Sequence, residues 1–287
     1  MNKWIPDELY RYRGVGSQHF NKELENLKKG KVWLDFLDSQ NDPFEGAVLP
    51  QATSLNEFES KLNEFRQYLK DNFPSEDLLP EALTPEDVDE ANFNCSQFHQ
   101  HVRKQVIVAS FSKSWNSTLM WGHYADQFAG ICLRFEYDYS ETSSDGPPFF
   151  QVQYWKDNPP TFSAFQFYVQ TRLSAALQHV KSAEHRRVIA DIAHETTKLA
   201  VSSKSFDWVY EEEFRMISIG SVPGYYPIPT LKLKEVIFGE RTKNSTFSQV
   251  ISTLGDGIQY SRMVLVPNSY SYKRERIAQH VITDLLK

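Results

Sequence analysis

The chain has 287 residues, 40% of them hydrophobic, so it can bury a full core as one large domain or two small ones. Its net charge of −6 and isoelectric point near 5.8 argue against binding nucleic acid or an anionic membrane through a broad basic surface. Cys95 and Cys132 lack metal-ligand spacing and are too few for a disulfide framework, so a reducing compartment is expected. The sequence shows no signal-peptide core and no apolar run near the roughly 20 residues of a membrane span, which predicts a soluble cytoplasmic protein without membrane contact.

The first segment of the chain predicts a strand, a helix and a second strand in succession. Residues 8–14, ELYRYRG, form a short aromatic run that ends in glycine. Residues 17–30 place apolar side chains on one helical face and end in a lysine pair before glycine. Residues 31–37, KVWLDFL, read as the second strand.

A helical insert is expected next, at about residues 54–104. Residues 54–72 begin with Ser54 as the N-cap of a capping box and carry an apolar stripe at helical spacing. Farther along, Thr84 followed by Pro85 is typical of the start of another helix.

Strands and helices alternate irregularly in the rest of the chain. The β-branched run QVIVASFS at residues 105–112 favours a central strand. We expect one α+β domain over residues 1–287, with a mixed or split β-sheet core and helical inserts at about 54–104 and 162–204. The other predicted elements are a short helix at 117–127, a strand at 130–137, strands at 235–239 and 260–267, and a basic terminal helix at 273–287.

Polar side chains at a spacing of two mark three of the strand-like segments. Because a strand turns alternate side chains to opposite faces, each pair would share one face. A surface salt bridge, a solvent-facing serine pair or a charged strand edge would explain any single pair without a function. The pairs are Arg11 and Arg13, Ser110 and Ser112, and Glu211 and Glu213, and Glu212 leaves the frame of the last pair open.

The loop SQNDPFEG at residues 39–46 predicts a turn, because Asn and Asp before proline initiate turns well. One interpretation is plain turn chemistry followed by a buried Phe44. The other presents Asp42 and Glu45 at the rim of a site.

The short predicted helix that follows the central strand supplies further candidates. Its large side chains cannot all face the core, which leaves some of Trp121, His123 and Tyr124 to form a polar aromatic wall. A third alternative is a metal-dependent hydrolase that uses Asp42, His123 and Asp126. The histidines lack zinc spacing, so we rank metal catalysis below nucleotide binding and predict no metal site.

The blocks LYRYR, NDPFEG, MWGHYADQFAGICLRF and WVYEEEFR occur in this order along nearly the whole chain. They resemble a widespread bacterial family that is known only as a domain of unknown function. More remotely, the strand–helix–strand opening and the order arginine, Ser-x-Ser, Glu-x-Glu are similar to ADP-ribosyltransferases of the arginine–serine–glutamate type. That resemblance implies a split β-sheet that binds NAD. In such a site arginine binds phosphate, serine contacts the nicotinamide ribose, and the last glutamate stabilises the cation formed as nicotinamide leaves.

This resemblance implies that NAD is the substrate and that catalysis depends on Glu213, Glu211 and Ser112. Glu213 would stabilise the ribosyl cation and Glu211 would act on the acceptor, which suits a bond cleavage that builds positive charge on the ribose. Arginine suits the diphosphate, and aromatic rings can stack on a base or on nicotinamide. The implied NAD-binding residues are Arg11, Arg13, Tyr12, Ser110, Trp121, His123, Tyr124 and Asp42.

Two classes of function therefore remain open. The first is a NAD-dependent mono-ADP-ribosyltransferase that modifies an unknown macromolecular acceptor, protein or nucleic acid, as a bacterial toxin or in phage defence. The second is a non-catalytic sensor module that binds a nucleotide or a peptide in the same cleft. Convergence of arginine, serine and glutamate on one cleft would favour catalysis, and dispersion would favour binding.

Overall fold

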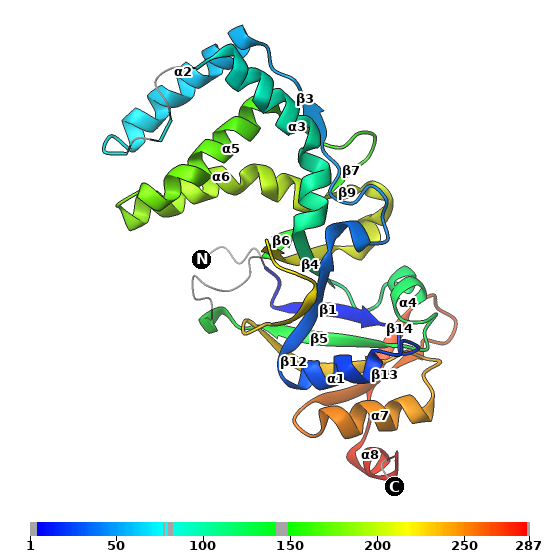
Figure 1. Ribbon diagram of the computed structural model, residues 1–287. Coiled ribbons are helices and arrows are strands. Elements are labelled where there is room, and N and C mark those ends of the chain that lie inside the picture. The colour runs from blue at the N-terminus through cyan, green and yellow to red at the C-terminus, as the bar shows by residue number, and fades with distance from the viewer. Residues whose placement is uncertain (1–4, 77, 80–82, 142–148, 286–287) are drawn as a thin grey trace. The chain divides into compact units, whose positions relative to one another are not determined.

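The protein forms two compact units, each described separately below. Figure 1 shows it as a computed structural model. The described residues are 5–76, 78–79, 83–141 and 149–285. The sheet unit comprises residues 1–36, 107–152 and 207–287, and the helical unit comprises residues 37–106 and 153–206. Every helix in the described part of the chain is too short or too polar to span a bilayer.

A mixed β-sheet with helices on both faces forms the core of the sheet unit. Its strands are β1 (Glu8–Arg13), β2 (Lys31–Phe36), β4 (Val106–Ser112), β5 (Ile131–Tyr137), β6 (Phe149–Gln151), β10 (Glu213–Ile219), β11 (Gly224–Pro227), β12 (Leu231–Phe238), β13 (Gln259–Leu265) and β14 (Tyr272–Arg276). Its helices are α1 (Phe20–Lys28), α4 (Thr118–Tyr124), α7 (Asn244–Leu254) and α8 (Gln279–Leu285). The strand order is β11-β2-β4-β1-β5-β12-β13-β14, and β10 pairs with both β4 and β6.

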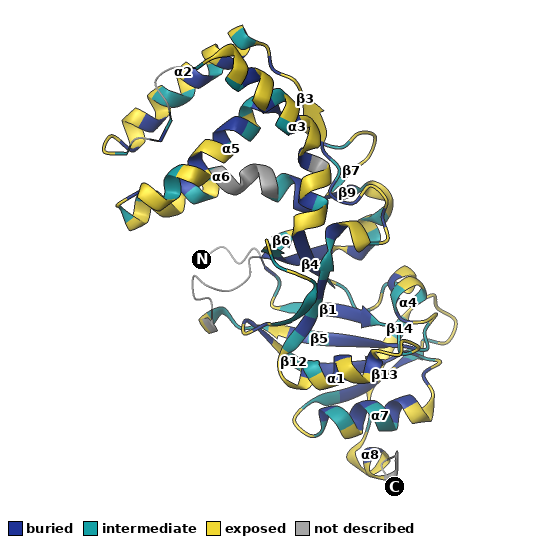
Figure 2. Ribbon diagram, in the orientation of Figure 1, coloured by how far each residue is buried: buried dark blue, intermediate teal, exposed yellow. Residues whose placement is uncertain are grey.

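The two faces of this sheet carry different clusters of side chains. Helices α1 and α7 pack on one face, where Leu9, Phe111 and Phe238 belong to the large apolar core (Figure 1). Helix α4 packs on the other face, where Tyr12 and Trp121 belong to a smaller aromatic cluster. Figure 2 shows that the central strands are buried while the outer surfaces of the covering helices are exposed. We call these the α1 face and the α4 face.

The strand–helix–strand opening of the chain is confirmed by β1, α1 and β2. The predicted basic helix at 273–287 is wrong in its first half. Residues 272–276 form β14, which pairs antiparallel with β13, and Gln279–Leu285 is the helical part of the segment among its described residues. Alternating charged side chains can lie on a strand edge as well as on a helix, so pairing with β13 decided the outcome.

The helical unit contains both predicted inserts, although residues 77 and 80–82 of the first lie outside the described residues. Ser54 and Thr84 are confirmed as N-caps, because Ser54 accepts from Glu57 N and Thr84 forms a capping box with Asp87. The Glu57 carboxylate accepts from Lys61 at 2.7 Å, and the reciprocal bond of the predicted Ser54 capping box is not seen among the described residues. The single domain over 1–287 stays a prediction. The elements of this unit are β3 (Leu49–Gln51), α2 (Leu55–Asn72), α3 (Pro85–Gln105), β7 (Gln153–Trp155), β8 (Thr161–Ser163), α5 (Ala164–Ala176), α6 (Ala183–Ser202) and β9 (Ser203–Ser205).

A tight turn after α4 connects it to β5 in the sheet unit. Asp126, Gln127 and Phe128 all have positive φ, at 46°, 52° and 73°, which non-glycine residues seldom adopt. The Asp126 carboxylate accepts hydrogen bonds from the backbone N–H groups of Val15 and Gly16, at 2.6 and 2.8 Å. The turn is thereby fixed to the chain that follows β1.

Close backbone packing holds the same turn from the side of β12. A Cβ atom at Gly239 would overlap the carbonyl group of Phe128. By contrast, a Cβ at Gly122, inside α4, would meet no atom within 4 Å. The two glycines therefore form a matched pair for a stability test.

We predict that Gly239→Ala lowers the free energy of unfolding by about 3 kcal/mol, because backbone must move to admit the methyl group. Gly122→Ala should raise it by roughly 0.5–1 kcal/mol, since alanine is the better helix former. Urea denaturation of both variants measures the difference. Equal stability of the two variants would contradict the packing described for the turn.

Candidate functional site

The predicted arginines lie on the α1 face of the sheet. Strand alternation places Arg11 and Arg13 with Leu9, which belongs to the core under α1. Arg13 donates to Glu23 of α1 at 2.7 Å, and Arg11 donates through Nη2 to the carbonyl oxygen of Trp33 at 3.0 Å. Both guanidinium groups are therefore occupied by structural contacts within the sheet unit.

Arg11 nevertheless makes few hydrogen bonds for a buried cation. Its residue is 9% exposed, its Nη1 is buried without a hydrogen-bond partner, and its guanidinium lies 5.5 Å from the centre of the Phe111 ring. Burial, and next the charge of Arg13, lower the pKa of Arg11 to about 9. Placing two neighbouring positive charges on this buried face is thus electrostatically unfavourable.

The predicted serines lie on the α4 face. The register pairs Ser112 with Tyr10, so both side chains are on the face opposite Arg11, and Ser110 shares that face by alternation. Ser112 is buried, and its Oγ accepts from the backbone N–H of Ser114 at 3.1 Å. The expected convergence of arginines with serines on one cleft is therefore wrong.

Tyr12 and Trp121 are structural residues of the α4 face. Their rings pack edge to face at 5.3 Å, Tyr12 donates to the carbonyl oxygen of Ser114 at 2.8 Å, and the Trp121 indole donates to that of Trp115 at 2.7 Å. Trp121 is fully buried. Burial also raises the pKa of Tyr12 well above its ordinary value. Trp121 therefore takes no part in the polar aromatic wall expected of some residues of its helix, and the ring of Tyr12 is likewise buried.

The acidic run is not one continuous strand. A 3-10 helix spans Phe206–Glu211, Glu212 has a positive φ of 44°, and β10 begins only at Glu213. The Glu212 carbonyl accepts from the backbone N–H of Lys113 at 3.1 Å, which fixes this kink beside the end of β4. Glu211 and Glu213 therefore do not belong to the same strand, and the alternation of side chains along a strand does not apply to them. The prediction that they share one strand face is wrong.

Glu213 is held in a buried ion pair that the sequence reasoning gave no role. Arg215 donates to it through Nε at 2.8 Å and through Nη2 at 3.0 Å, and both side chains are almost fully buried. Phe214 and Met216 belong to the core under α1, so this pair points to the α4 face. The Glu-x-Arg spacing was the signal that could have identified it.

Glu211 meets the short helix α4 through Tyr124, whose hydroxyl donates to the Glu211 carboxylate at 2.5 Å. The structure thus places Tyr124 of the MWGHYAD segment beside the acidic run, and its role in binding a ligand stays a prediction. His123 is exposed, and its ring lies 6.1 Å from that of Tyr210, which in turn lies 6.1 Å from Trp208.

The rings of Tyr210 and Trp208 are partly exposed and were missed by sequence reasoning. Their signal was the aromatic run immediately before the glutamates. Together Tyr124, Glu211, His123, Tyr210 and Trp208 define what we call the acidic–aromatic site. It combines a fixed buried carboxylate with accessible rings.

Asp42 belongs to the helical unit, where it is buried in the NDPFEG turn. Its Oδ1 accepts from the backbone N–H of Phe44 at 2.9 Å, and its Oδ2 is buried without a hydrogen-bond partner. Phe44 is 64% exposed, so the expected burial of this ring is wrong. Within the ranges that the structure describes, no three His, Cys, Asp or Glu side chains gather to hold a metal ion.

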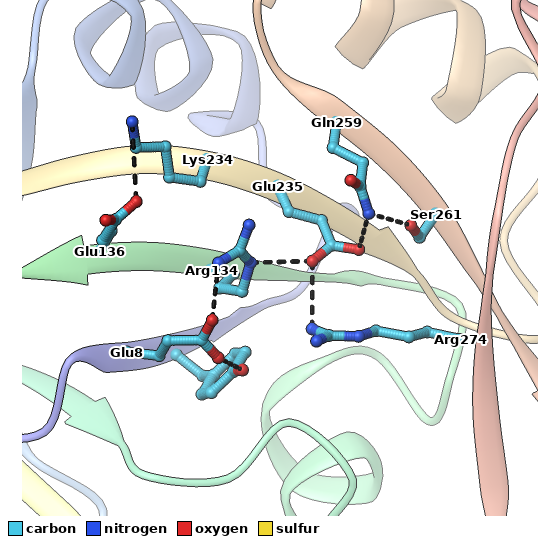
Figure 3. A network of polar contacts seen from close by, with 9 residues as sticks. Glu8, Arg134, Glu136, Lys234, Glu235, Gln259, Ser261 and Arg274 are labelled. Atoms are coloured by element: carbon cyan, nitrogen blue, oxygen red, sulfur yellow. Dashed lines mark hydrogen bonds and ion pairs between the residues drawn. The ribbon is translucent and has the colours of Figure 1, made fainter.

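A second polar network on the α4 face ties five strands together (Figure 3). Buried Glu235 of β12 accepts from Arg134 at 2.9 Å, from Arg274 at 3.1 Å and from Gln259 at 2.9 Å. Arg134 also donates to Glu8 of β1 at 2.8 Å. Each group of this network has a partner, which is how a buried charge is made tolerable. Its evident role is to fix β1, β5, β12, β13 and β14 in register.

Comparison with known proteins supports a family resemblance and gives no activity. Residues 120–216 match the model of a family described as "Protein of unknown function (DUF2971)". This segment includes residues 120–124 of α4, the turn at 126–128 and the acidic run, so it contains every residue of the acidic–aromatic site. No curated protein and no solved structure matches the chain.

We predict that Glu213→Gln lowers the free energy of unfolding by about 3 kcal/mol, because it removes the charge that pairs with Arg215 in a buried setting. Glu212→Gln is the control, since its exposed side chain should tolerate the change within roughly 0.5 kcal/mol. Chemical denaturation measures both. If Glu213→Gln left the free energy of unfolding unchanged, the ion pair would not support the fold.

Proposed function

We propose that the sheet unit binds a nucleotide at the acidic–aromatic site, with NAD as the first ligand to test. The observation that carries this proposal is the 2.5 Å hydrogen bond that fixes the buried Glu211 carboxylate to Tyr124 beside partly exposed rings. A carboxylate can accept two hydrogen bonds from a ribose diol, as acidic residues do in other dinucleotide sites. The rings of Tyr210 and Trp208 supply flat surfaces on which a base or nicotinamide can stack.

Binding is favoured over transfer by the placement of the arginines. The arginine–serine–glutamate arrangement requires arginine to act beside the glutamates, whereas Arg11 and Arg13 lie on the α1 face with Glu23 and Trp33. Glu213, the expected cation stabiliser, is held in a bidentate pair by Arg215. The function supported best is therefore a nucleotide-binding module, as a sensor would require.

A NAD-dependent ADP-ribosyltransferase is the second candidate, because one observation favours it. The strands that carry the three polar pairs are neighbours in the sheet, with β1 next to β4 and β4 next to β10. Ser112 and Glu213 both lie on the α4 face, where a cation formed from NAD would meet a carboxylate. In this candidate a macromolecular acceptor would receive the ADP-ribose, as in a toxin or an anti-phage effector.

We predict that NAD binds the protein and that Tyr210→Ala weakens its affinity at least about tenfold, because a stacking ring contributes on the order of 1–3 kcal/mol. The control is Tyr270→Ala, which removes a fully exposed tyrosine from the same unit and should leave the affinity unchanged. Isothermal titration measures both. Absence of NAD binding at millimolar concentration, or equal affinity of the two variants, would contradict the proposal.

A nicotinamide-release assay distinguishes binding from transfer. The binding module returns NAD intact, whereas a transferase releases nicotinamide from the wild type and labels an acceptor in lysate. In the second case Glu211→Gln should slow release by about a hundredfold while Glu212→Gln does not, as expected when a carboxylate beside the reacting ribose is lost. Circular dichroism of each variant confirms that folding is retained.

A further inference from the structure

The helical unit contains a pocket of about 190 Å³ that the acidic–aromatic site does not include. It lies along the parallel pair of β7 and β9, where Trp155 is directly opposite Ser205. The pocket is lined by Phe44, Ala47, residues 155–160 and residues 203–205. Its volume is smaller than that of pockets for drug-sized ligands, so it suits a single ring system.

Exposed apolar side chains gather around this pocket. Phe44 is 64% exposed and Trp155 is 36% exposed, and both line it. Phe206, which is 39% exposed, lies next to Lys156. Large exposed rings concentrated at one place are uncommon on a soluble surface and mark binding sites.

The NDPFEG turn holds Phe44 in this exposed position by rigid contacts. Gly46 has a φ of 68°, and a Cβ there would lie 2.8 Å from the carbonyl oxygen of Ala200. Its backbone N–H donates to the carbonyl oxygen of Ser203 at 3.2 Å, and Arg103 donates to that of Pro43 at 3.0 Å. The ring of Phe44 is thus presented by an anchored turn, which reduces the entropy that a ligand would have to overcome.

The polar part of the lining favours an anionic group on the ligand. The ammonium group of Lys156 lies 4.8 Å from the centre of the Phe206 ring, and Lys156 has no ion-pair partner among the residues that the structure describes. Lys204 is a second ammonium group in the lining, and it pairs with buried Glu45 at 3.6 Å. Asp157 is the one carboxylate that lines the described pocket.

We propose that this pocket binds a small planar aromatic molecule that carries an anionic group. Its ring packs among Phe44, Trp155 and the two prolines at 159–160, and its anionic group is directed to Lys156. The inference is independent of the nucleotide proposal, because it concerns the other unit and a different set of residues. It also assigns a role to the NDPFEG turn, which the acidic–aromatic site does not use.

The test is isothermal titration of the full chain with indole-3-acetate, and with indole and acetate as its separate halves. We expect indole-3-acetate to bind more tightly than either half. Phe44→Ala and Trp155→Ala should each weaken it at least about tenfold, in line with the loss of a ring contact. Lys156→Gln should weaken indole-3-acetate severalfold and leave indole unchanged.

Two matched controls separate the pocket from general surface effects. Phe93→Ala removes a ring that is 66% exposed elsewhere in the helical unit, and Lys70→Gln removes an exposed ammonium group on α2, so both should bind like the wild type. Absence of indole-3-acetate binding at millimolar concentration would overturn the proposal, as would equal losses in Phe44→Ala and Phe93→Ala. Equal affinity for indole and indole-3-acetate would overturn the assignment of an anionic ligand.

Discussion

The alternation of side chains along β1 is the constraint on which the sheet unit depends. Leu9 and Arg11 point to the α1 face, while Tyr10 and Tyr12 point to the α4 face. Because Tyr10 pairs with Ser112, the side chain of Ser112 on β4 also points to the α4 face. A shift by one residue would turn Leu9 and Arg11 to the α4 face and the two tyrosines to the α1 face. The arginines are therefore kept away from the serines by the same pattern that builds the core.

Opposite charges on the α4 face lie next to each other in local ion pairs and networks. Glu213 is held by Arg215, and Glu235 is held by Arg134 and Arg274, so these carboxylates stabilise strands and their neighbours. Glu211 accepts a hydrogen bond from the Tyr124 phenol of α4 and lies beside partly exposed rings. Its position beside these rings is why Glu211, rather than Glu213, is the carboxylate that we connect with a ligand.

Local signals in the sequence predicted the elements well, because caps and periodicity act within a few residues. The start of α3 at Thr84–Pro85 and the strand at residues 106–112 are examples. The site depended on two features without a local signal. The first was the face of β1 relative to β4, which are about a hundred residues apart in sequence, and the second was the left-handed conformation of Glu212 among three identical residues.

The most direct test of the central claim maps where a nucleotide contacts the sheet unit. Backbone amide chemical shifts would be recorded by NMR during titration of the isotope-labelled full chain with NAD. The account predicts that perturbed signals concentrate in α4 and at residues 208–213, with little change near Trp33 and Arg13. Perturbations centred on Trp33 and Arg13, with those of α4 unchanged, would place the ligand on the arginine side of the sheet and contradict the account.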